Sequence, residues 1–254
     1  MSSRKRRKLE NTIAALQKRY GYQVVRRAGE LKIINPPVLS SGFAALDACT
    51  GCNGIPLGVL TLLSGRITSG KLTLAYKTLA NATSAAIVDF NHHSDPDYLT
   101  RCGIDLHKLV VVRPTADQEA INLLVDLVRS RQLQMILVDS GTNLLCTEQA
   151  ITSHFYRALA VLPQALRQAR CGLLLIDEVD PPWQRWLNLD RSRVVRRHAA
   201  LHIEMQREQW LQQAGILVGY RATAHVLKSR WRYDKPSTPL EIRFNGTVKA
   251  QATW

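Results

Sequence analysis

Two glycines and a lysine at a fixed spacing are the residues of this sequence whose chemistry is easiest to name. Gly65 and Gly70 are separated by four residues, and Lys71 follows directly. Glycines let the backbone curl so that successive N–H groups point inward, and the lysine adds a positive charge. An apolar run over 59–63 precedes this loop, and helical spacing resumes after it. The order of strand, loop and helix predicts a phosphate-binding loop; an ordinary strand–turn–helix is the alternative.

The residue that follows the lysine departs from the usual pattern. A loop of the form G-x-x-x-x-G-K-[ST] uses that hydroxyl to ligate Mg²⁺, whereas this chain has Leu72. Thr73 carries a hydroxyl, but one step along a helix turns a side chain away by about 100°. We therefore expect a phosphate cradle that lacks its usual metal ligand.

A carboxylate near the loop is a second candidate for metal chemistry. Asp139 ends the apolar run MILVD, at the carboxyl end of an expected buried strand. An aspartate in this place commonly helps to hold Mg²⁺ beside a phosphate loop. Capping of the following loop is the alternative interpretation of Asp139.

The charge balance indicates a polyanionic partner. The chain of 254 residues has 34 Lys and Arg against 20 Asp and Glu, a net charge of +14 and a pI near 10.0. Such an excess is typical of proteins that bind nucleic acid, although an inert basic surface is the alternative. The length and the hydrophobic content of 46% allow one sizeable core.

Targeting and cysteine signals are weak. No apolar window is long enough to cross a membrane, and no apolar core follows the basic N-terminus, so we expect a cytoplasmic chain without a secretory leader. Cys49 and Cys52 have the spacing of a metal or redox pair, but no second pair or nearby histidine completes such a site. Buried free thiols in a reducing cytosol are the expectation.

The loop lies in a chain whose strands and helices alternate. Apolar runs predict strands over 59–64, 85–90, 109–113, 135–139 and 172–177. Helical patterns fill the intervals over 72–82, 95–102, 117–131 and 148–170. This alternation predicts an α/β fold with a central, mainly parallel sheet flanked by helices on both faces. Period-two patterns over 200–205, 214–227 and 238–246 predict antiparallel strands that extend the sheet on its C-terminal side.

The first 37 residues predict a separate arm. A basic cluster over 4–8 leads into a helical pattern that reaches Tyr20, and one or two short strands follow within 22–34. Pro36 and Pro37 then force a linker. We expect a basic N-terminal helix–strand arm over 1–37 that serves oligomerisation or DNA binding, joined to a core over 38–254. A solvated basic tail is the alternative.

Four blocks, in order, resemble the bacterial RecA recombinases. They are SSGFAALDACTGCNGIPLG (40–58), VDFNHHSDPDYLTRCGIDLHKLVVVRP (88–114), ILVDS (136–140) and HVLKSRWRYDKPSTPLEIRFNGTV (225–248). The resemblance extends over about residues 9–248. It implies a RecA-like P-loop core, ATP and Mg²⁺ as cofactors, and a part in DNA recombination and repair, including the SOS response to DNA damage.

The resemblance also implies the nucleotide contacts. It assigns the phosphates of ATP to Gly65, Ser69, Gly70 and Lys71. Adenine would be held by Tyr98 through stacking and by Asp95 at the exocyclic amine. Lys228 and Arg230 fall where the family has two lysines that reach across a filament interface to the neighbour's ATP. RecA's separate C-terminal domain is expected to be missing, since the sequence stops at Trp254.

Three departures bear on hydrolysis. Leu72 replaces the Mg²⁺-binding hydroxyl, and Asn91 stands where the family has the glutamate that activates water, which an amide cannot do. Glu178 replaces the glutamine that senses the γ-phosphate, and its charge has the wrong sign for that contact. We expect hydrolysis to be slow or lost. In the alternative, an active ATPase uses Thr73 and Asp139 to hold Mg²⁺, with Glu148 or Glu178 in place of the missing glutamate.

The second DNA-contacting region of the family is retained over 177–197, whereas the first, between Ser140 and Gly172, is shortened. The retained region interleaves aromatic and basic side chains: Trp183, Arg185, Trp186, Arg191, Arg193, Arg196 and Arg197. Rings that stack on bases and guanidiniums that meet phosphates suit single-stranded DNA. A surface loop anchored by tryptophan, or a protein-docking patch, is the alternative.

The function that these signals favour is a DNA repair or recombination protein that binds single-stranded DNA and ATP with weak or absent hydrolysis. It would form its own filament or join one of RecA. The lost motifs also resemble ImuA-type accessory relatives of RecA, which implies docking on RecA or on a translesion polymerase. An active DNA-dependent ATPase is the remaining alternative.

Overall fold

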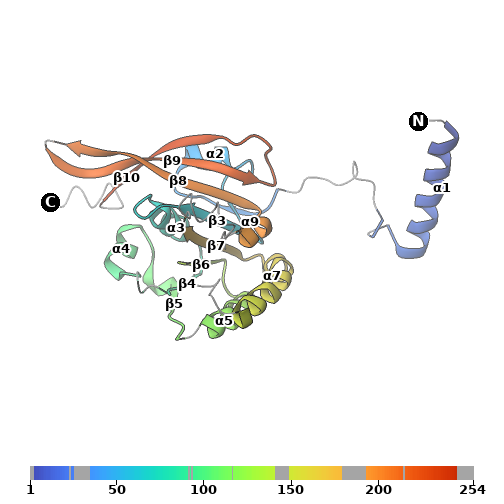
Figure 1. The fold of residues 1–254 in the computed structure, drawn as a ribbon, viewed down its shortest axis with the longest axis horizontal. Helices are drawn as coiled ribbons and strands as arrows, with labels where there is room; N and C mark the ends of the chain where they lie inside the picture. The colour runs from blue at the N-terminus through green and yellow to red at the C-terminus, as the bar shows by residue number, and fades with distance from the viewer. Residues whose placement is uncertain are drawn as a thin grey trace. The chain divides into compact units, whose positions relative to one another are not determined.

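The computed structural model describes residues 3–22, 24–25, 35–90, 92, 94–115, 117–140, 149–178, 193–213 and 215–244 (Figure 1). The chain divides into two compact units, Met1–Asn35 and Pro36–Trp254. In the first unit, helix α1 (Ser3–Tyr20) has Lys18 and Arg19 in its last turn, where basic side chains favour the helix dipole. The strands expected within 22–34 fall mostly outside the described residues.

An eight-stranded sheet forms the centre of the second unit. Its strands are β3 (Leu60–Gly65), β4 (Ala85–Val88), β5 (Leu109–Val112), β6 (Met135–Val138), β7 (Gly172–Glu178), β8 (Leu201–Gln213), β9 (Ile216–Ser229) and β10 (Ser237–Arg243). Their order is β10-β9-β8-β3-β7-β6-β4-β5, parallel from β8 to β5 and antiparallel in the two pairs β8–β9 and β9–β10. A small pair, β1 (Val38–Leu39) and β2 (Ile55–Pro56), lies apart from this sheet.

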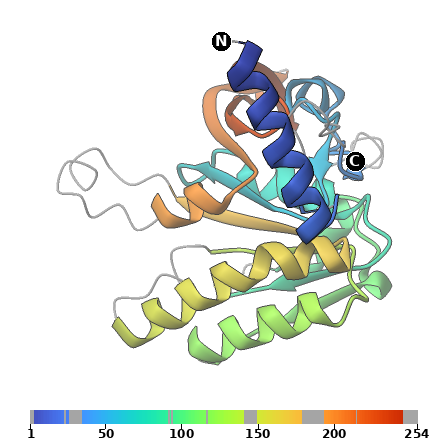
Figure 2. The ribbon, with the colours of Figure 1, turned by 90° about the vertical axis from the view of Figure 1, so that its right-hand side faces the viewer.

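Helices cover both faces of the sheet. On one face lie α5 (Asp117–Arg129), α7 (Gln149–Ala169) and α9 (Arg193–His198), with α5 and α7 side by side (Figure 2). On the other face lie α2 (Ala44–Cys49), α3 (Lys71–Leu79) and α4 (Pro96–Arg101); a single turn of 3₁₀ helix, η2 (Leu106–Lys108), leads into β5. Each face buries its own apolar cluster, so the inner strands β3, β4, β6 and β7 are buried on both sides.

The predicted α/β class is confirmed, with one difference in the C-terminal strands. The chain leaves α9 beside the start of β3, where the amide of Ala200 donates to the carbonyl of Leu60 at 2.8 Å. It therefore adds β8 parallel to β3, and the antiparallel ladder begins only at the β8–β9 hairpin. None of the described helices is long and apolar enough to cross a lipid bilayer.

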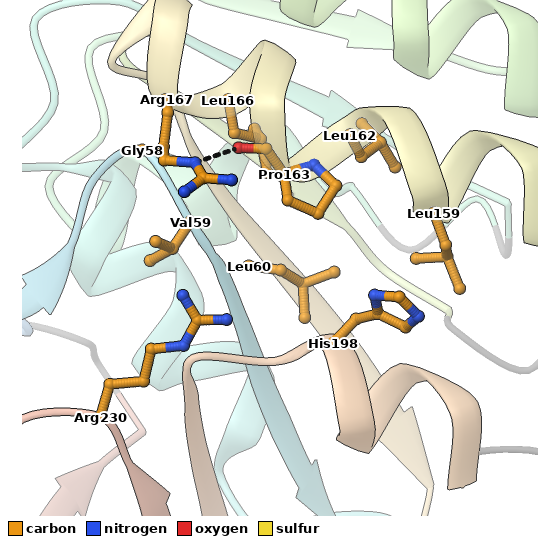
Figure 3. A pocket seen from close by; sticks show the side chains of 10 residues that line it. All are labelled: Gly58, Val59, Leu60, Leu159, Leu162, Pro163, Leu166, Arg167, His198 and Arg230. Atoms are coloured by element: carbon orange, nitrogen blue, oxygen red, sulfur yellow. Dashed lines mark hydrogen bonds between the residues drawn. The ribbon is translucent and has the colours of Figure 1, made fainter. Parts of the chain in front are cut away.

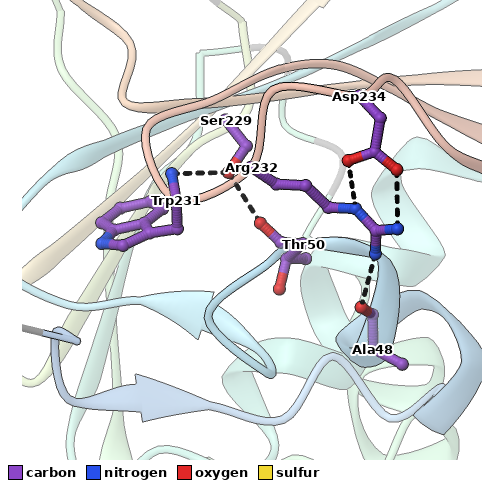
Figure 4. A network of polar contacts seen from close by, with 6 residues as sticks. All are labelled: Ala48, Thr50, Ser229, Trp231, Arg232 and Asp234. Atoms are coloured by element: carbon purple, nitrogen blue, oxygen red, sulfur yellow. Dashed lines mark hydrogen bonds and ion pairs between the residues drawn. The ribbon is translucent and has the colours of Figure 1, made fainter. Parts of the chain in front are cut away.

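The turn after β9 is tied to the segment that precedes the phosphate loop (Figure 4). Ser229 Oγ donates to the carbonyl of Thr50 at 2.7 Å, and the Arg232 guanidinium pairs with the Asp234 carboxylate. Gly51 permits this approach, because a Cβ there would lie 2.7 Å from the Cβ of Arg232. The contacts hold the β9–β10 connection against α2, so the antiparallel strands have a fixed position beside the core.

Candidate nucleotide site

The two glycines of the loop are needed because other strands pack directly against it. A Cβ on Gly65 would lie 2.5 Å from Ser69 Oγ and 2.6 Å from the carbonyl oxygen of Met205 in β8. Gly70 has a φ of +92°, and a Cβ there would overlap Ile242 of β10 and lie 2.9 Å from the hydroxyl of Tyr220. Strands from the far end of the sequence thus form the wall of the loop.

The loop presents donors and positive charge at the start of α3. Gly70 caps the helix and Lys71 is its first residue, so unpaired amides and the positive helix end face the loop. Lys71 Nζ donates to the carbonyl of Arg66 at 3.1 Å. Ser69 Oγ is buried and has no hydrogen-bond partner among the described residues. A buried hydroxyl without a partner beside a lysine and a helix N-terminus fits an anion such as phosphate.

These groups line one pocket of about 650 Å³, a volume typical of small-molecule sites. Of the residues predicted to bind the nucleotide or metal, the pocket brings together Ser69, Gly70, Lys71, Thr73, Tyr98 and Asp139. Gly65 does not line the pocket, but its backbone lies directly against Ser69 of the loop. The arrangement can hold a phosphate chain at the loop and a flat group beside the tyrosine.

Two carboxylates, those of Glu178 and Asp139, line the same pocket as Lys71. Glu178 ends β7 directly opposite Gly65 in the β3–β7 register, and its exposed side chain lines the pocket. Burial lowers the pKa of Lys71, while the charges of Glu178 and Asp177 act in the opposite direction. Asp139 Oδ1 accepts from the amide of Phe90 at 2.9 Å, which fixes the carboxylate at the end of β6. The site is therefore an anion cradle with negative charge on its rim.

Comparison with known proteins identifies the family. A sequence model of the RecA N-terminal domain matches residues 7–171. This chain belongs to the RecA family. It is 25% identical over 270 residues to Protein RecA of Clostridium acetobutylicum (99% of this chain, 77% of that protein). Over 249 residues it is 26% identical to Protein RecA of Clostridium novyi (91% and 71%), and over 149 residues 35% identical to that of Thermus aquaticus (57% and 44%). It is thus a divergent RecA-like protein of DNA recombination and repair.

In this RecA family member, Tyr98 lies at the pocket wall and Asp95 does not line the pocket. The Tyr98 hydroxyl is 2.6 Å from Thr73 Oγ1, and its ring meets Tyr76 edge to face at 5.8 Å between centroids. Burial raises the pKa of Tyr98, so the phenol keeps its proton. Asp95 caps α4, where its Oδ1 accepts from the amide of Asp97 at 3.1 Å. The predicted adenine contacts remain predictions, with Tyr98 the better placed of the two.

Lys228 and Arg230 lie away from the loop, toward the other end of the parallel strands. In the β8–β9 ladder, Lys228 pairs with His202, which in turn pairs with Leu62, the third residue of β3, whereas the loop follows the end of β3. Leu62 precedes Gly65 by three residues of strand, or about 10 Å. Arg230 lines a small, mostly apolar pocket against α7, beside Val59 (Figure 3). Within one chain, therefore, neither side chain is next to the phosphate loop.

The predicted DNA contacts are only partly described. Trp183, Arg185, Trp186 and Arg191 lie outside the described residues, as do Asn91 and Glu148. Arg193, Arg196 and Arg197 are three of the six residues of α9; Arg197 is exposed and Arg196 half-buried. The backbone of this helix is held from β9, since Lys228 Nζ donates to the carbonyls of Arg196 and Arg197, at 2.9 Å each.

Two residues of the site were not predicted from the sequence. Tyr220 of β9 lines the pocket above Gly70, and Arg207 of β8 donates to Thr68 Oγ1 in the loop at 2.9 Å. The guanidinium of Arg207 also lies over the ring of Trp210, 4.3 Å from its centroid. The period-two pattern of these strands could place both residues on the sheet. It could not reveal that β8 pairs with β3 and so runs past the phosphate loop.

Proposed function

We propose that the chain is a RecA-like recombination and repair protein that binds a nucleoside triphosphate at the phosphate loop and single-stranded DNA through the region 177–197. The observation that carries the nucleotide part is the buried Ser69 hydroxyl, which has no partner in the described part of the chain and lies beside Lys71 at the start of α3. Membership of the RecA family supports both ligands. The net charge of +14 supports a polyanionic partner.

The proposed protein hydrolyses its nucleotide slowly or not at all. Leu72 contributes only carbon atoms to the pocket where a hydroxyl would serve a metal ion. Glu178 places a carboxylate at the rim, where it repels the terminal phosphate instead of donating to it. Asn91 at the predicted position of the general base adds to this argument from sequence alone.

Self-assembly, or addition to a RecA filament, is the proposed working state. The distance of Lys228 and Arg230 from the chain's own loop supports a role for them toward a neighbouring copy. Strand β5 at the end of the sheet order exposes Val110 by 49% and Val111 by 41%, which supports a covered surface in the assembly. Docking on a translesion polymerase stays a prediction from resemblance.

The nucleotide proposal is tested by equilibrium binding of a fluorescent ATP analogue to the full chain, with and without single-stranded DNA. We expect saturable binding, at least about 100-fold weaker in Lys71→Ala. Turnover of ATP is then measured under the same conditions and expected to be far below one per second, the low end for typical enzymes. Saturable binding that is unchanged in Lys71→Ala would place the nucleotide elsewhere.

The DNA proposal is tested by binding to single-stranded DNA at several salt concentrations. Phosphate contacts release counterions, so affinity should fall steeply with salt, and each lost contact should reduce the slope by about one. Arg193→Ala with Arg197→Ala is the test variant, and Arg129→Ala, on the exposed side of α5, is the matched control. Absence of binding at low salt would end this part of the proposal.

An accessory protein that uses neither ligand is the second candidate function. The observation that favours it is the carboxylate of Glu178, which competes with phosphate for Lys71. In that case the ATP analogue and DNA both fail to bind, while the chain co-sediments with preformed RecA filaments. Co-sedimentation that requires Lys71 would instead favour the nucleotide-dependent form.

A further inference from the structure

The residue after the phosphate-loop lysine cannot serve a metal ion. Leu72 lines the pocket and packs its side chain against the apolar core beneath α3. A phosphate loop normally places a serine or threonine hydroxyl at this point, directly against Mg²⁺. Here the same stretch of pocket wall consists of methyl and methylene groups, which offer no ligand to a hard cation.

The neighbouring hydroxyl of Thr73 does not replace it. Thr73 is buried, and its Oγ1 is 2.6 Å from the Tyr98 hydroxyl. The Tyr220 hydroxyl interacts with the same threonine, which lowers the pKa that burial raises in Tyr220. Neutral hydroxyls that bond one another form a closed set in the pocket wall. A metal ion would have to break the Thr73–Tyr98 hydrogen bond before it could use this oxygen.

The carboxylates do not supply the missing ligand set either. Asp139 Oδ1 already accepts the amide of Phe90. Among the residues that the structure describes, no three His, Cys, Asp or Glu side chains gather as a metal-binding group would. Without a hydroxyl at position 72, the protein would hold Mg²⁺ in this pocket only through Asp139 or Glu178, with water and phosphate completing the octahedron. The loop therefore offers the ion fewer ligands than an ordinary phosphate loop does.

Positive charge beside the pocket comes from Arg207 of β8, which does not itself line the pocket but contacts the lining residue Thr68. Arg207 Nη1 donates to Thr68 Oγ1, and the guanidinium rests on the Trp210 ring. Thr68 is a non-glycine residue with a φ of +62°, so the loop holds an uncommon conformation at the point that Arg207 contacts. A guanidinium has five N–H donors and suits phosphate oxygens, and a single hydrogen bond to Thr68 leaves donors for a ligand.

We propose that this pocket binds its nucleoside triphosphate as the metal-free anion, with Lys71 and Arg207 supplying the charge that Mg²⁺ supplies at ordinary phosphate loops. The inference rests on the proposed nucleotide binding and names the form of the ligand. Arg207 is a binding residue of the site that the family motifs do not single out. The proposal also accounts for Leu72, because a pocket that excludes the metal has no use for a hydroxyl there.

The experiment measures binding of the fluorescent ATP analogue to the full chain in MgCl₂ and in EDTA at equal ionic strength. Affinity in MgCl₂ should be no higher than in EDTA, because most of the nucleotide is then the metal complex and not the free anion that the pocket takes. Arg207→Ala should weaken binding about tenfold in both, since it removes a charged donor. The matched control is Arg221→Ala, a half-buried arginine of β9 that pairs with Glu241 and does not line the pocket, and it should leave the affinity unchanged.

A second pair of variants tests whether the missing hydroxyl at position 72 is the reason that Mg²⁺ does not help binding. Leu72→Ser returns the hydroxyl, and Leu72→Ala makes the same loss of packing without it. Mg²⁺ should tighten binding by about tenfold in Leu72→Ser and should not tighten it in Leu72→Ala. Thermal melts of the two variants should agree, because both lose the same apolar contacts.

Three results would separate the inferences. Binding of the unchanged protein only in MgCl₂ would overturn the metal-free proposal and leave nucleotide binding intact. Equal responses of Leu72→Ser and Leu72→Ala to Mg²⁺ would also overturn it, since Leu72 would not be the cause. Absence of binding in either buffer would instead refute the proposed nucleotide function itself.

Discussion

Two lysines near opposite ends of the strands of one sheet both donate hydrogen bonds to main-chain carbonyls, but they have different roles. Lys71, at the carboxyl edge, donates to one main-chain carbonyl inside a pocket of about 650 Å³. Lys228, at the amino edge, donates to two carbonyls at the end of α9. Burial is the main cause that lowers both pKa values. The first ammonium faces space for a ligand, whereas the second spends its donors on a helix end. Within one chain, the surroundings of each lysine, and not its residue type, decide whether its ammonium can meet a ligand.

The variant Lys71→Met tests the difference between the two lysines most directly. Nucleotide affinity should fall by about 100-fold or more, while the free energy of unfolding stays level or rises, because a desolvated charge is removed from the interior. Titration with the ATP analogue and urea unfolding of the same sample measure both effects. A large loss of stability would mean that Lys71 supports the fold as Lys228 does.

His202, the neighbour of Lys228 in the β8–β9 ladder, should make the fold sensitive to acid. This side chain is buried, its Nε2 lies 2.7 Å from Ser64 Oγ, and burial together with Arg196 and Lys228 lowers its pKa to about 4. Between pH 6.5 and 4 the side chain of His202 binds a proton in the unfolded chain but not in the folded chain. Stability is therefore complete above pH 6.5 and should fall by roughly 2 to 3 kcal/mol as the pH drops to 4.

Urea unfolding at pH 7, 5.5 and 4 measures this loss. His202→Gln should flatten the part of the profile between pH 6.5 and 4, and His107→Gln, at an exposed position in η2, is the matched control. A profile of His202→Gln that runs parallel to that of the unchanged protein would assign the acid sensitivity to carboxylates instead.

Lys228→Met should show the reverse of the effect at Lys71. Loss of two hydrogen bonds to the end of α9 should cost about 1 to 2 kcal/mol of unfolding free energy. Nucleotide affinity of the isolated chain should not change, because the loop lies at the other edge. Lys235→Met, an exposed lysine in the turn before β10, is the control. Equal stabilities of the two variants would refute the capping role.

The smallest expected effect concerns the rim of the pocket. Glu178→Gln removes a carboxylate that attracts Lys71 and repels phosphate, so nucleotide should bind about threefold more tightly. The gain should shrink at high salt because the side chain is exposed. Weaker binding in this variant would show that the carboxylate orients the lysine usefully.

The sequence predicted the parts of this fold whose signals are local. The apolar run of β3, the glycines of the loop and the helical pattern of α3 lie within a short stretch, and the predicted strand and helix limits agree within a few residues. Arg207 and Tyr220 could not be found in that way. Their place beside the loop depends on the pairing of β3 with β8, which is distant in sequence.

The same limit applies to Lys228 and Thr73. Family resemblance assigned Lys228 to a neighbour's nucleotide, but its hydrogen bonds to α9 follow from where the β8–β9 ladder ends. The motif showed that Thr73 is one position out of place, yet its bond to Tyr98 depends on how α4 packs against α3. Sequence spacing shows which side chains could bind a ligand, and tertiary packing decides which of them already form hydrogen bonds within the protein.

The close fit of Gly70 under Ile242 and Tyr220 bears on how the protein is made. Both partners lie in the last strands of the described core, so the ribosome releases the loop long before the strands that enclose it. At usual elongation rates the interval from Gly70 to Ile242 is roughly ten to thirty seconds. During that time the nascent chain has the loop sequence without its wall, and the complete pocket forms only once β9 and β10 have been made.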